Sequence, residues 1–316
     1  MGRRYLVAIW LGFVVLIACG PQPIGPPPAA PAPVQQPAHL LPPDLDLAIR
    51  LDLDELRGRF GSDFVAALEL PAVAEDDPPA RALVTSLLRQ SSALWFAIRP
   101  PGDSARGPDA LDNVLVLRGN YREVNPRDFA GENVWQAPVD LGGDWRRYSR
   151  VALGRGGPER LYAYGDHLRV LLSRAEIDSM DALLRGRLST EGLRPPARGM
   201  ASIALRSAAW GNALDEAGVP LRWLESATSA RSRIVAEGEG YRMYLELNYA
   251  DKESAHSAAD QLSLALLLLG QRAGSFGPLL KAVDVKAAET DVLAEVAVSD
   301  AQGAALLACA FGRCGF

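Results

Sequence analysis

The segment 114-VLVLRGNY-121 reappears in altered form as 242-RMYLELNY-249, and this pair is the strongest indication of the fold. Each segment is a short hydrophobic run that ends in Asn-Tyr, and the second follows the first by 128 positions. Short hydrophobic runs bounded by polar residues are typical of strands. We therefore expect two equivalent strands, one ending at Tyr121 and the other at Tyr249.

A second pair of segments repeats with nearly the same spacing. The segment 168-LRVLLSRAEIDSMDALL-184 corresponds to 293-LAEVAVSDAQGAALLAC-309, with 126 positions between Ser173 and Ser299. In each segment a strand-like run is followed by the serine and, three residues later, by Glu176 or Gln302. This spacing is that of a capping box, in which the serine hydroxyl and the side chain three residues on satisfy free backbone amides at a helix start. We expect both serines to cap helices at equivalent positions.

Upstream of these pairs, the body of the chain opens with 44-DLDLAIRLDLDEL-56. Its leucines and isoleucine alternate with mostly polar residues, which predicts a strand with one buried face. A helix should follow, with Leu56, Phe60 and Phe64 on its inner side. We expect a second helix near 80–91 and strands at 93–100 and 112–119.

Short turns, such as Gly165-Asp166 and Gly238-Glu239-Gly240, join neighbouring strands and favour antiparallel pairing. The predicted class is α+β, with helices packed on antiparallel sheets. The two spacings predict two divergent repeats of a βαββ(α)ββα-like unit, over 44–190 and 199–316. A single unrepeated α+β domain is the alternative.

The N-terminus carries a targeting signal. Two arginines precede an apolar run from Tyr5 to Ala18, which is shorter than the roughly 20 residues of a membrane-spanning helix. A positive segment before a short apolar run is typical of a signal peptide, here 1–18. The end of the run, Leu16-Ile17-Ala18-Cys19, resembles the lipobox of bacterial lipoproteins. That resemblance implies acylation of Cys19 and anchoring in the cell envelope, with Gly20 favouring an outer membrane where the organism has one.

Three other interpretations of the N-terminus are weaker. A transmembrane anchor would need a longer apolar run. Myristoylation at Gly2 requires Ser or Thr at position 6, where the chain has Leu6. The pair Arg3-Arg4 is compatible with twin-arginine export, but the flanking pattern is incomplete.

A proline-rich linker follows the lipobox cysteine, so that 19–43 comprises Cys19 and this linker. Residues 20–43 contain ten prolines, and such a segment favours extended polyproline II, which spans about 70 Å at roughly 3.1 Å per residue.

Without the signal peptide the chain has 38 acidic and 31 basic residues, a net charge of −7. That balance argues against nucleic acid as a partner. The expected contact with the membrane is the N-terminal lipid anchor that the lipobox resemblance implies.

Motifs for catalysis, cofactors and metals are absent from the sequence, which contains no G-x-S-x-G, H-E-x-x-H, Walker or C-x-x-C pattern. We expect no cofactor, no metal and no catalytic residue. Cys309 and Cys314 are candidates for a disulfide because the chain is exported. Two free thiols, or half of a metal site, are the alternatives. His167 in a predicted turn and His256 near a helix start are most simply solvated or hydrogen-bonded histidines.

Two segments are candidate interaction surfaces. In 144-DWRRYSR-150, Trp145 and Arg147 would share one face of a strand, where they could hold an anionic group, or the segment could be a charged edge strand. In the helix from Asp251 to Gln271, Asp251 is the expected N-cap. The helix has an apolar stripe and, toward its C-terminal end, a wider apolar surface that includes Leu264, Leu267 and Leu268. The stripe is formed by Ala255, Ala258, Ala259, Leu262, Ala265, Leu266 and Leu269. Burial of these three leucines between the two halves is the expected outcome, and exposure would mark a docking surface for a protein or a lipid.

These features favour a non-enzymatic envelope lipoprotein that binds a partner, such as another envelope protein, or serves as a scaffold held off the membrane by its spacer. A binder of small or lipid-like ligands is the alternative. An enzyme with a carboxylate site that the sequence does not reveal is the third hypothesis.

Overall fold

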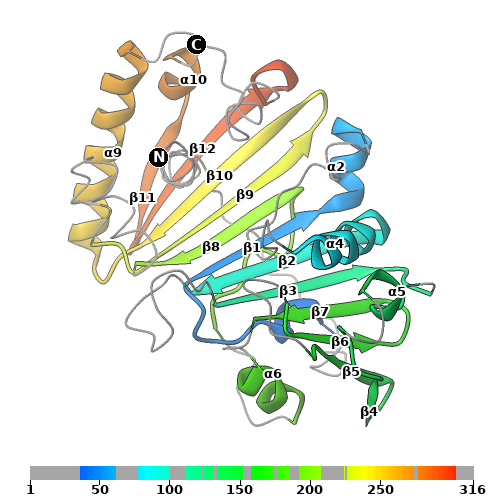
Figure 1. Ribbon diagram of the computed structural model, residues 1–316. Coiled ribbons are helices and arrows are strands. Elements are labelled where there is room, and N and C mark those ends of the chain that lie inside the picture. The colour runs from blue at the N-terminus through cyan, green and yellow to red at the C-terminus, as the bar shows by residue number, and fades with distance from the viewer. Residues whose placement is uncertain are drawn as a thin grey trace. The chain divides into compact units, whose positions relative to one another are not determined.

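The computed structural model describes residues 36–61, 77–99, 112–122, 124–130, 134–151, 158–173, 177–185, 192–207, 224, 226–272 and 277–303. The described chain divides into two compact units, one that ends at Arg194 and one that begins at Pro195. Both units combine helices with antiparallel strands, so the predicted α+β class is confirmed (Figure 1).

The first unit contains a sheet in which the strands follow the order β1-β2-β3-β7-β6-β5-β4. These strands are β1 (Leu47–Asp52), β2 (Ser91–Arg99), β3 (Asp112–Gly119), β4 (Val139–Gly142), β5 (Trp145–Ser149), β6 (Arg160–Tyr164) and β7 (Leu168–Leu172). Its helical segments are η2 (Pro37–Leu40), α2 (Leu53–Phe60), α4 (Pro78–Gln90), α5 (Arg127–Ala130) and α6 (Ile177–Leu184). Each neighbouring pair of strands is antiparallel.

Strand β1 confirms the predicted strand, but its more buried face is not the leucine face. Leu47 and Ile49 are partly exposed, whereas Ala48 and Arg50 on the opposite face are buried. The Arg50 guanidinium is retained there because it pairs with Asp52 at 3.0 Å and lies over the Trp95 ring at 5.9 Å. A buried arginine is tolerated when such partners compensate its lost hydration.

Helix α2 ends where the sequence changes the backbone conformation. Gly61 follows the helix with a φ of +83°, a value that residues with a Cβ rarely adopt. Its N–H donates to the carbonyl oxygen of Arg57 at 2.9 Å. The predicted inner residue Leu56 is buried. Phe64, predicted for the same helix, lies outside the described residues.

The second unit contains a sheet in the order β11-β12-β10-β9-β8. The strands are β8 (Ala201–Arg206), β9 (Ser229–Glu237), β10 (Gly240–Asn248), β11 (Asp284–Ala288) and β12 (Asp291–Ser299), and the helices are α9 (Lys252–Arg272) and α10 (Gly277–Lys281). The predicted turn at Gly238–Gly240 joins β9 to β10, and the positive φ of Gly238 (+58°) fits a tight hairpin.

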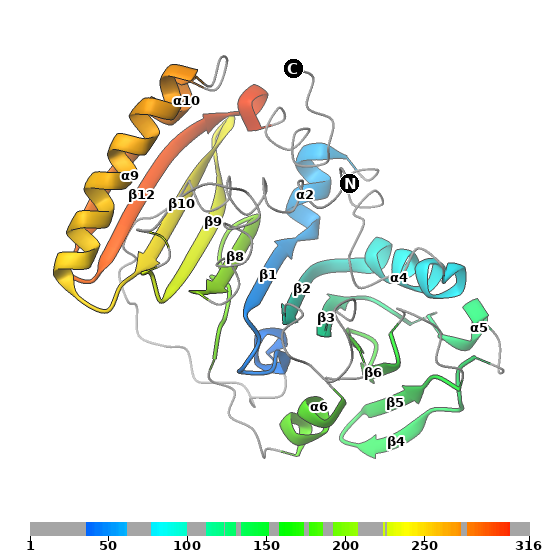
Figure 2. The same cartoon turned by 60° about the vertical axis from the view of Figure 1, so that its left-hand side comes forward.

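The two faces of the second sheet differ in polarity. One face is apolar: Tyr241, Leu245 and Leu247 of β10 are buried beside the residues of β12 that pair with them, Val298, Ala294 and Val292. The opposite face carries cross-strand polar pairs, such as Arg242 with Glu237 at 2.8 Å and Arg231 with Glu246 at 3.5 Å. An antiparallel sheet with one packed face and one solvated face has this alternation. Figure 1 shows α9 alongside β11 and β12, and Figure 2 shows it alongside β12.

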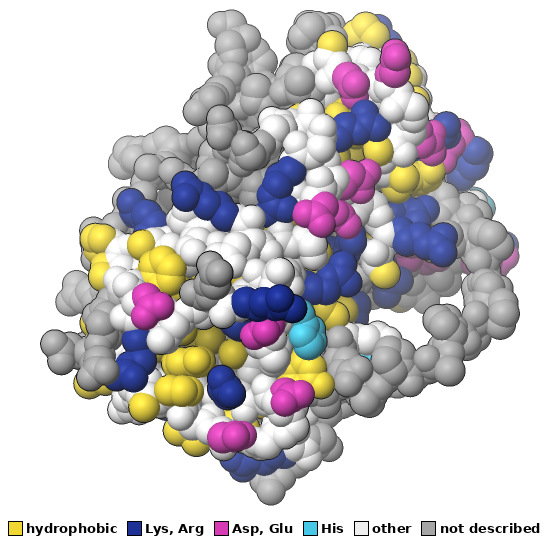
Figure 3. All heavy atoms as spheres, turned by 90° about the vertical axis from the view of Figure 1, so that its right-hand side faces the viewer, with side chains coloured by type: hydrophobic (Ala, Val, Ile, Leu, Met, Phe, Trp, Pro, Cys, Tyr) yellow, Lys and Arg dark blue, Asp and Glu magenta, His cyan; other side chains and the backbone are white. Residues whose placement is uncertain are grey.

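The surface shown in Figure 3 is mixed in character. Lys and Arg side chains lie between Asp and Glu side chains, with hydrophobic side chains among them. No single sign of charge dominates this face, so long-range electrostatic attraction of a partner is weak there. Binding on such a surface has to come from local arrangements of side chains.

Candidate interaction surfaces

Helix α9 begins at a capped N-terminus, as predicted. The Asp251 carboxylate accepts hydrogen bonds from the backbone N–H and from the hydroxyl of Ser254, both at 2.8 Å. These bonds stabilise the ionised carboxylate, so the pKa of Asp251 lies below its ordinary value. Asp251 thus satisfies one of the free amides of the first turn and fixes where the helix starts.

One stripe of α9 is packed against the sheet. Its buried residues recur at helical spacing and are Ala255, Ala258, Ala259, Leu262 and Leu266. This stripe consists of alanines in the first half of the helix and leucines in the second, and α9 contacts β11 and β12.

Two glycines bring the end of α9 against α10. A Cβ on Gly277 would lie 2.4 Å from the carbonyl oxygen of Gly270, and a Cβ on Gly270 would lie 2.9 Å from Cγ of Lys281. Such contacts exclude larger side chains at both positions. Because Leu279 and Leu280 of α10 are also buried, α10 takes up packing space beside α9.

The remaining leucines of α9 are exposed. We call this set the outer leucine face, and its members retain between 45% and 57% of their full exposure: Leu264, Leu267, Leu268 and Leu269. The expected burial of Leu264, Leu267 and Leu268 between two halves is therefore wrong. Leu269, expected in the packed stripe, is also exposed.

The outer leucine face occupies only the C-terminal half of the helix. In the N-terminal half the outward side chains are polar, among them His256, Asp260 and Gln261. From Gln261 to Gln271 the helix has no charged residue. His256 is exposed, and its Nδ1 lies 2.9 Å from the carbonyl oxygen of Lys252, so it is a hydrogen-bonded surface residue as expected.

Trp145 and Arg147 share a face of β5, but that face is covered. Trp145 is 7% exposed and its ring centroid lies 5.0 Å from that of Tyr164. Arg147 pairs with Asp181 of α6 at 3.6 Å, and the same carboxylate accepts a hydrogen bond from the Tyr162 hydroxyl at 2.6 Å. These side chains join α6 to the sheet, so the predicted open surface at Trp145 and Arg147 is wrong.

The interpretation of 144–150 as an edge strand is also wrong. β5 pairs with β4 on one side and with β6 on the other. β4 is the outermost strand of this unit, and all four of its residues are exposed. The short β4 hairpin was not anticipated from the sequence, because Val139–Gly142 has only four residues and ends in glycine.

Helix α4 is held at its N-terminus by a buried ion pair. The Asp77 carboxylate accepts a hydrogen bond from the Ala80 backbone N–H at 3.0 Å and pairs with Arg150 at 2.5 Å. Both side chains are more than nine-tenths buried. The carboxylate therefore caps the helix while Arg150 balances its charge.

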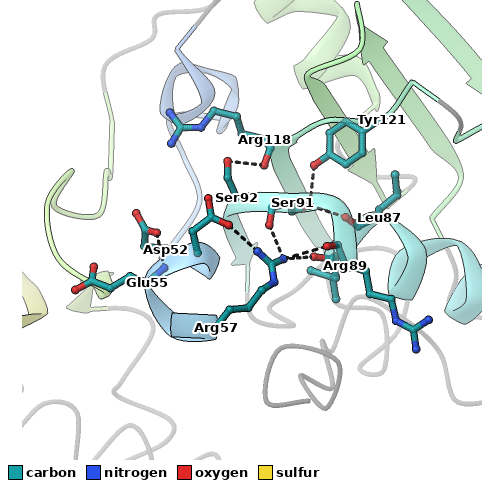
Figure 4. Close-up of polar contacts among 11 residues, drawn as sticks. Asp52, Glu55, Arg57, Leu87, Arg89, Ser91, Ser92, Arg118 and Tyr121 are labelled. Atoms are coloured by element: carbon teal, nitrogen blue, oxygen red, sulfur yellow. Dashed lines mark hydrogen bonds and ion pairs between the residues drawn. The ribbon is translucent and has the colours of Figure 1, made fainter. Parts of the chain in front are cut away.

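The C-terminus of α4 is held by an arginine from α2. Nη2 of Arg57 donates to the carbonyl oxygens of Leu88 at 2.8 Å, Arg89 at 3.4 Å and Ser91 at 2.6 Å (Figure 4). The last carbonyls of a helix lack partners within the helix and carry partial negative charge, so a guanidinium stabilises them. Nothing in the sequence pairs Arg57 with residues more than 30 positions away, and its role emerges only from the fold.

Beside this arginine, the Ser91 hydroxyl donates to the Leu87 carbonyl oxygen and shares a hydrogen bond with the Tyr121 hydroxyl, each at 2.7 Å (Figure 4). Burial raises the pKa of the Tyr121 phenol, and the Ser91 hydrogen bond only partly opposes this. Tyr121 is therefore a neutral buried anchor. Its backbone N–H donates to the Asp166 carbonyl oxygen at 2.7 Å.

Several predicted sites fall outside the described residues, namely Cys19, Cys309 and Cys314. Within the described ranges, no group of three or more His, Cys, Asp or Glu residues is arranged to hold a metal ion. His167 lies in the turn between β6 and β7, as predicted, and its ring is nearly perpendicular to that of Tyr164. The helices of the described part of the chain include none that is long and apolar enough to cross a membrane.

Comparison with known proteins identifies a related fold. No family model matches the chain, and no curated protein sequence matches it. Among solved structures, crystal form I of TP0453 is similar with a TM-score of 0.50 and 10% sequence identity, over 87% of this chain and 98% of that chain. Crystal form III of TP0453 gives a TM-score of 0.47 and 11% identity, over 86% and 97%. At this identity the likeness to crystal form I concerns the fold alone.

Proposed function

We propose that this protein is a non-enzymatic, lipid-anchored protein of the bacterial cell envelope that binds an envelope protein through the outer leucine face of α9. The observation that carries the proposal is the exposure of four leucines on a helix whose opposite side is already packed. Exposed apolar clusters of this kind are unusual on a monomeric protein and mark interaction sites.

The N-terminal sequence supports the envelope location. The lipobox resemblance at Leu16–Cys19 implies an acyl group on Cys19, and the part of the proline-rich linker before η2 would separate that group from the folded units. A lipid-anchored protein moves in two dimensions beside other envelope proteins, so a small apolar surface suffices for binding at a high local concentration.

The binding surface can be tested with a pair of matched variants. Leu267→Glu introduces a charge into the outer leucine face, and Gln261→Glu introduces the same charge at an exposed position on the polar part of the helix. A photo-crosslinking residue placed at position 264 in cells should give a discrete adduct that is retained in Gln261→Glu and lost in Leu267→Glu. Unchanged thermal melting of both variants would show that the fold is intact. An adduct that persists in Leu267→Glu would contradict the proposal.

The location can be tested separately at Cys19. Replacement of Cys19 by Ala should release the protein from the membrane fraction or stop its processing. An intact mass of the mature native protein that lacks an acyl group would overturn this part of the proposal without affecting the α9 surface.

We also propose that the two units arose by duplication. The order β1-β2-β3-β7-β6 in the first unit parallels β8-β9-β10-β12-β11 in the second, with β4 and β5 as an addition at the end of the first. The insertion after β3 contains α5, β4 and β5, whereas the insertion after β10 contains α9 and α10.

Two backbone details support this correspondence. The N–H of Tyr121 donates to the Asp166 carbonyl oxygen in the β6–β7 turn, and that of Tyr249 donates to the Thr290 carbonyl oxygen in the β11–β12 turn, at 2.7 and 2.9 Å. Ser173 bonds to Asn113 at the start of β3, and Ser299 is paired with Gly240 at the start of β10.

The predicted capping box is present at Ser299. Its backbone N–H donates to Oε1 of Gln302 at 3.0 Å, and the Gln302 N–H donates to its hydroxyl at 3.3 Å. The Ser173 hydroxyl instead accepts a hydrogen bond from the Asn113 N–H, while Glu176 lies outside the described residues. Superposition of the two units in a crystal structure tests the duplication. Failure of β7 and β12 to coincide when β3 and β10 are matched would contradict it.

A further inference from the structure

A second candidate binding site lies in the first unit, between α4 and α5. Residues of the two helices line an open groove of about 480 Å³. Its polar lining residues are Arg81, Thr85, Ser86 and Arg89 of α4, and its apolar lining includes Ala82 and the ring of Phe129 from α5. This volume falls within the range of about 300–1,000 Å³ that is usual for small-molecule sites.

The cationic character of this groove follows from the amphipathicity of α4. The helix buries Leu83, Val84, Leu87 and Leu88, so the residues between them face outward. Arg81, Thr85 and Arg89 follow one another at four-residue spacing and form one outward row. Because α4 contains no acidic residue from Pro78 to Gln90, no carboxylate of the helix itself lies beside Arg89.

Helix α4, which supplies most of the lining of the groove, is held at both of its ends. Asp77 and Arg150 hold the start of α4, and Arg57 holds its end through three carbonyl oxygens. Figure 4 shows the Arg89 carbonyl directed toward Arg57 while the Arg89 guanidinium points away from that cluster. Among the described residues, the Arg89 guanidinium has no hydrogen bond or ion pair, so it is available to a ligand. A site on a rigid element loses less conformational entropy on binding.

We propose that this groove binds a small amphiphile with one anionic phosphate headgroup. The guanidinium groups of Arg89 and Arg81 would engage the phosphate oxygens, for which arginine has matching donors. Thr85 and Ser86 would add neutral hydrogen bonds, and the apolar part would lie against Ala82 and Phe129. This inference does not depend on the proposed role of α9, because the two sites are on different units of the chain.

The probe for this site is decyl phosphate below its micelle concentration, titrated into the full-length chain by calorimetry. Decyl maltoside tests the apolar chain without the charge, and inorganic phosphate tests the charge without the chain. We expect decyl phosphate to bind more tightly than either. Arg89→Gln should weaken its binding at least about tenfold, as expected for the loss of a charge-assisted hydrogen bond. Phe129→Ala should weaken it as well.

Arg146→Gln is the matched control, because Arg146 is an exposed arginine of β5 outside the groove. Binding that is equal in the wild type and Arg89→Gln, or equally reduced in Arg146→Gln, would overturn the proposal. Equal binding of decyl maltoside, or no binding of decyl phosphate, would do the same.

Vesicles distinguish the two sources of such a headgroup. If vesicles that contain anionic phospholipid compete with decyl phosphate and vesicles of neutral phospholipid do not, the groove takes a headgroup from a bilayer. If neither vesicle competes while decyl phosphate binds through Arg89, the ligand is a soluble amphiphile.

Discussion

Leu266 and Leu267 of α9 provide a controlled measurement of which side of the helix is packed. They are adjacent, so Leu→Ala has the same effect on helix propensity at both positions. Leu266 is 3% exposed and Leu267 is 51% exposed. Any difference between the two alanine variants therefore reports burial.

The magnitudes follow from these exposures. Leu266→Ala removes a fully buried side chain and leaves a cavity between α9 and the sheet, which should cost about 2–5 kcal/mol. Leu267 has about half of its surface in contact with protein, so Leu267→Ala should cost about 1 kcal/mol or less. At about 2–4 °C per kcal/mol, the first variant should melt roughly 4–20 °C below the wild type and the second within about 4 °C of it.

The assay measures the melting temperature and the urea unfolding of both variants and of the wild type. The urea slope should be unchanged, because neither substitution alters the surface exposed on unfolding appreciably. If Leu267→Ala destabilises the protein as much as Leu266→Ala, the outer leucine face is buried by another part of the chain, and the argument for a docking surface is lost.

Four other predictions concern the helix termini. Asp77→Ala should cost about 3–5 kcal/mol in urea unfolding, because it leaves Arg150 buried without its partner; a cost below 1 kcal/mol would mean that the pair is solvated. Arg57→Ala should cost about 1–3 kcal/mol, and hydrogen exchange should accelerate in the last turn of α4 before other parts of the first unit. Ser299→Ala should cost about 0.5–2 kcal/mol through loss of the capping box, with Ser299→Asn restoring most of it. The pKa of Asp251 is lower in the folded protein than its ordinary value of about 3.9, so its contribution to stability is complete above that pH and is lost as the pH falls through the folded-state pKa. Asp251→Asn should therefore lose less stability than the wild type on acidification below about pH 4. If the unfolding free energy of both proteins falls equally over this pH range, the capping role is contradicted.

Local sequence patterns determined the secondary structure of this protein to a large extent. Period-two alternation located β1, and the hydrophobic runs ending in Asn-Tyr located the strands that end just before Tyr121 and Tyr249. Asp251 and Ser299 were identifiable as helix caps because capping depends on residues three positions apart. The α+β class followed from short turns between strands, which permit only antiparallel pairing.

Tertiary structure decided which surfaces are covered. The apolar end of α9 could face a second layer or solvent, and only the fold shows that Leu264, Leu267 and Leu268 are exposed. Trp145 and Arg147 have the composition of a binding surface, yet Trp145 is buried against Tyr164 and Arg147 is half-buried in a pair with Asp181 of α6. Arg57 and the groove beside Arg89 depend on contacts between segments 30 or more residues apart. The periodicity of apolar residues depends on local sequence and indicates the type of secondary structure. Burial and side-chain pairing depend instead on contacts between segments that are far apart in the sequence.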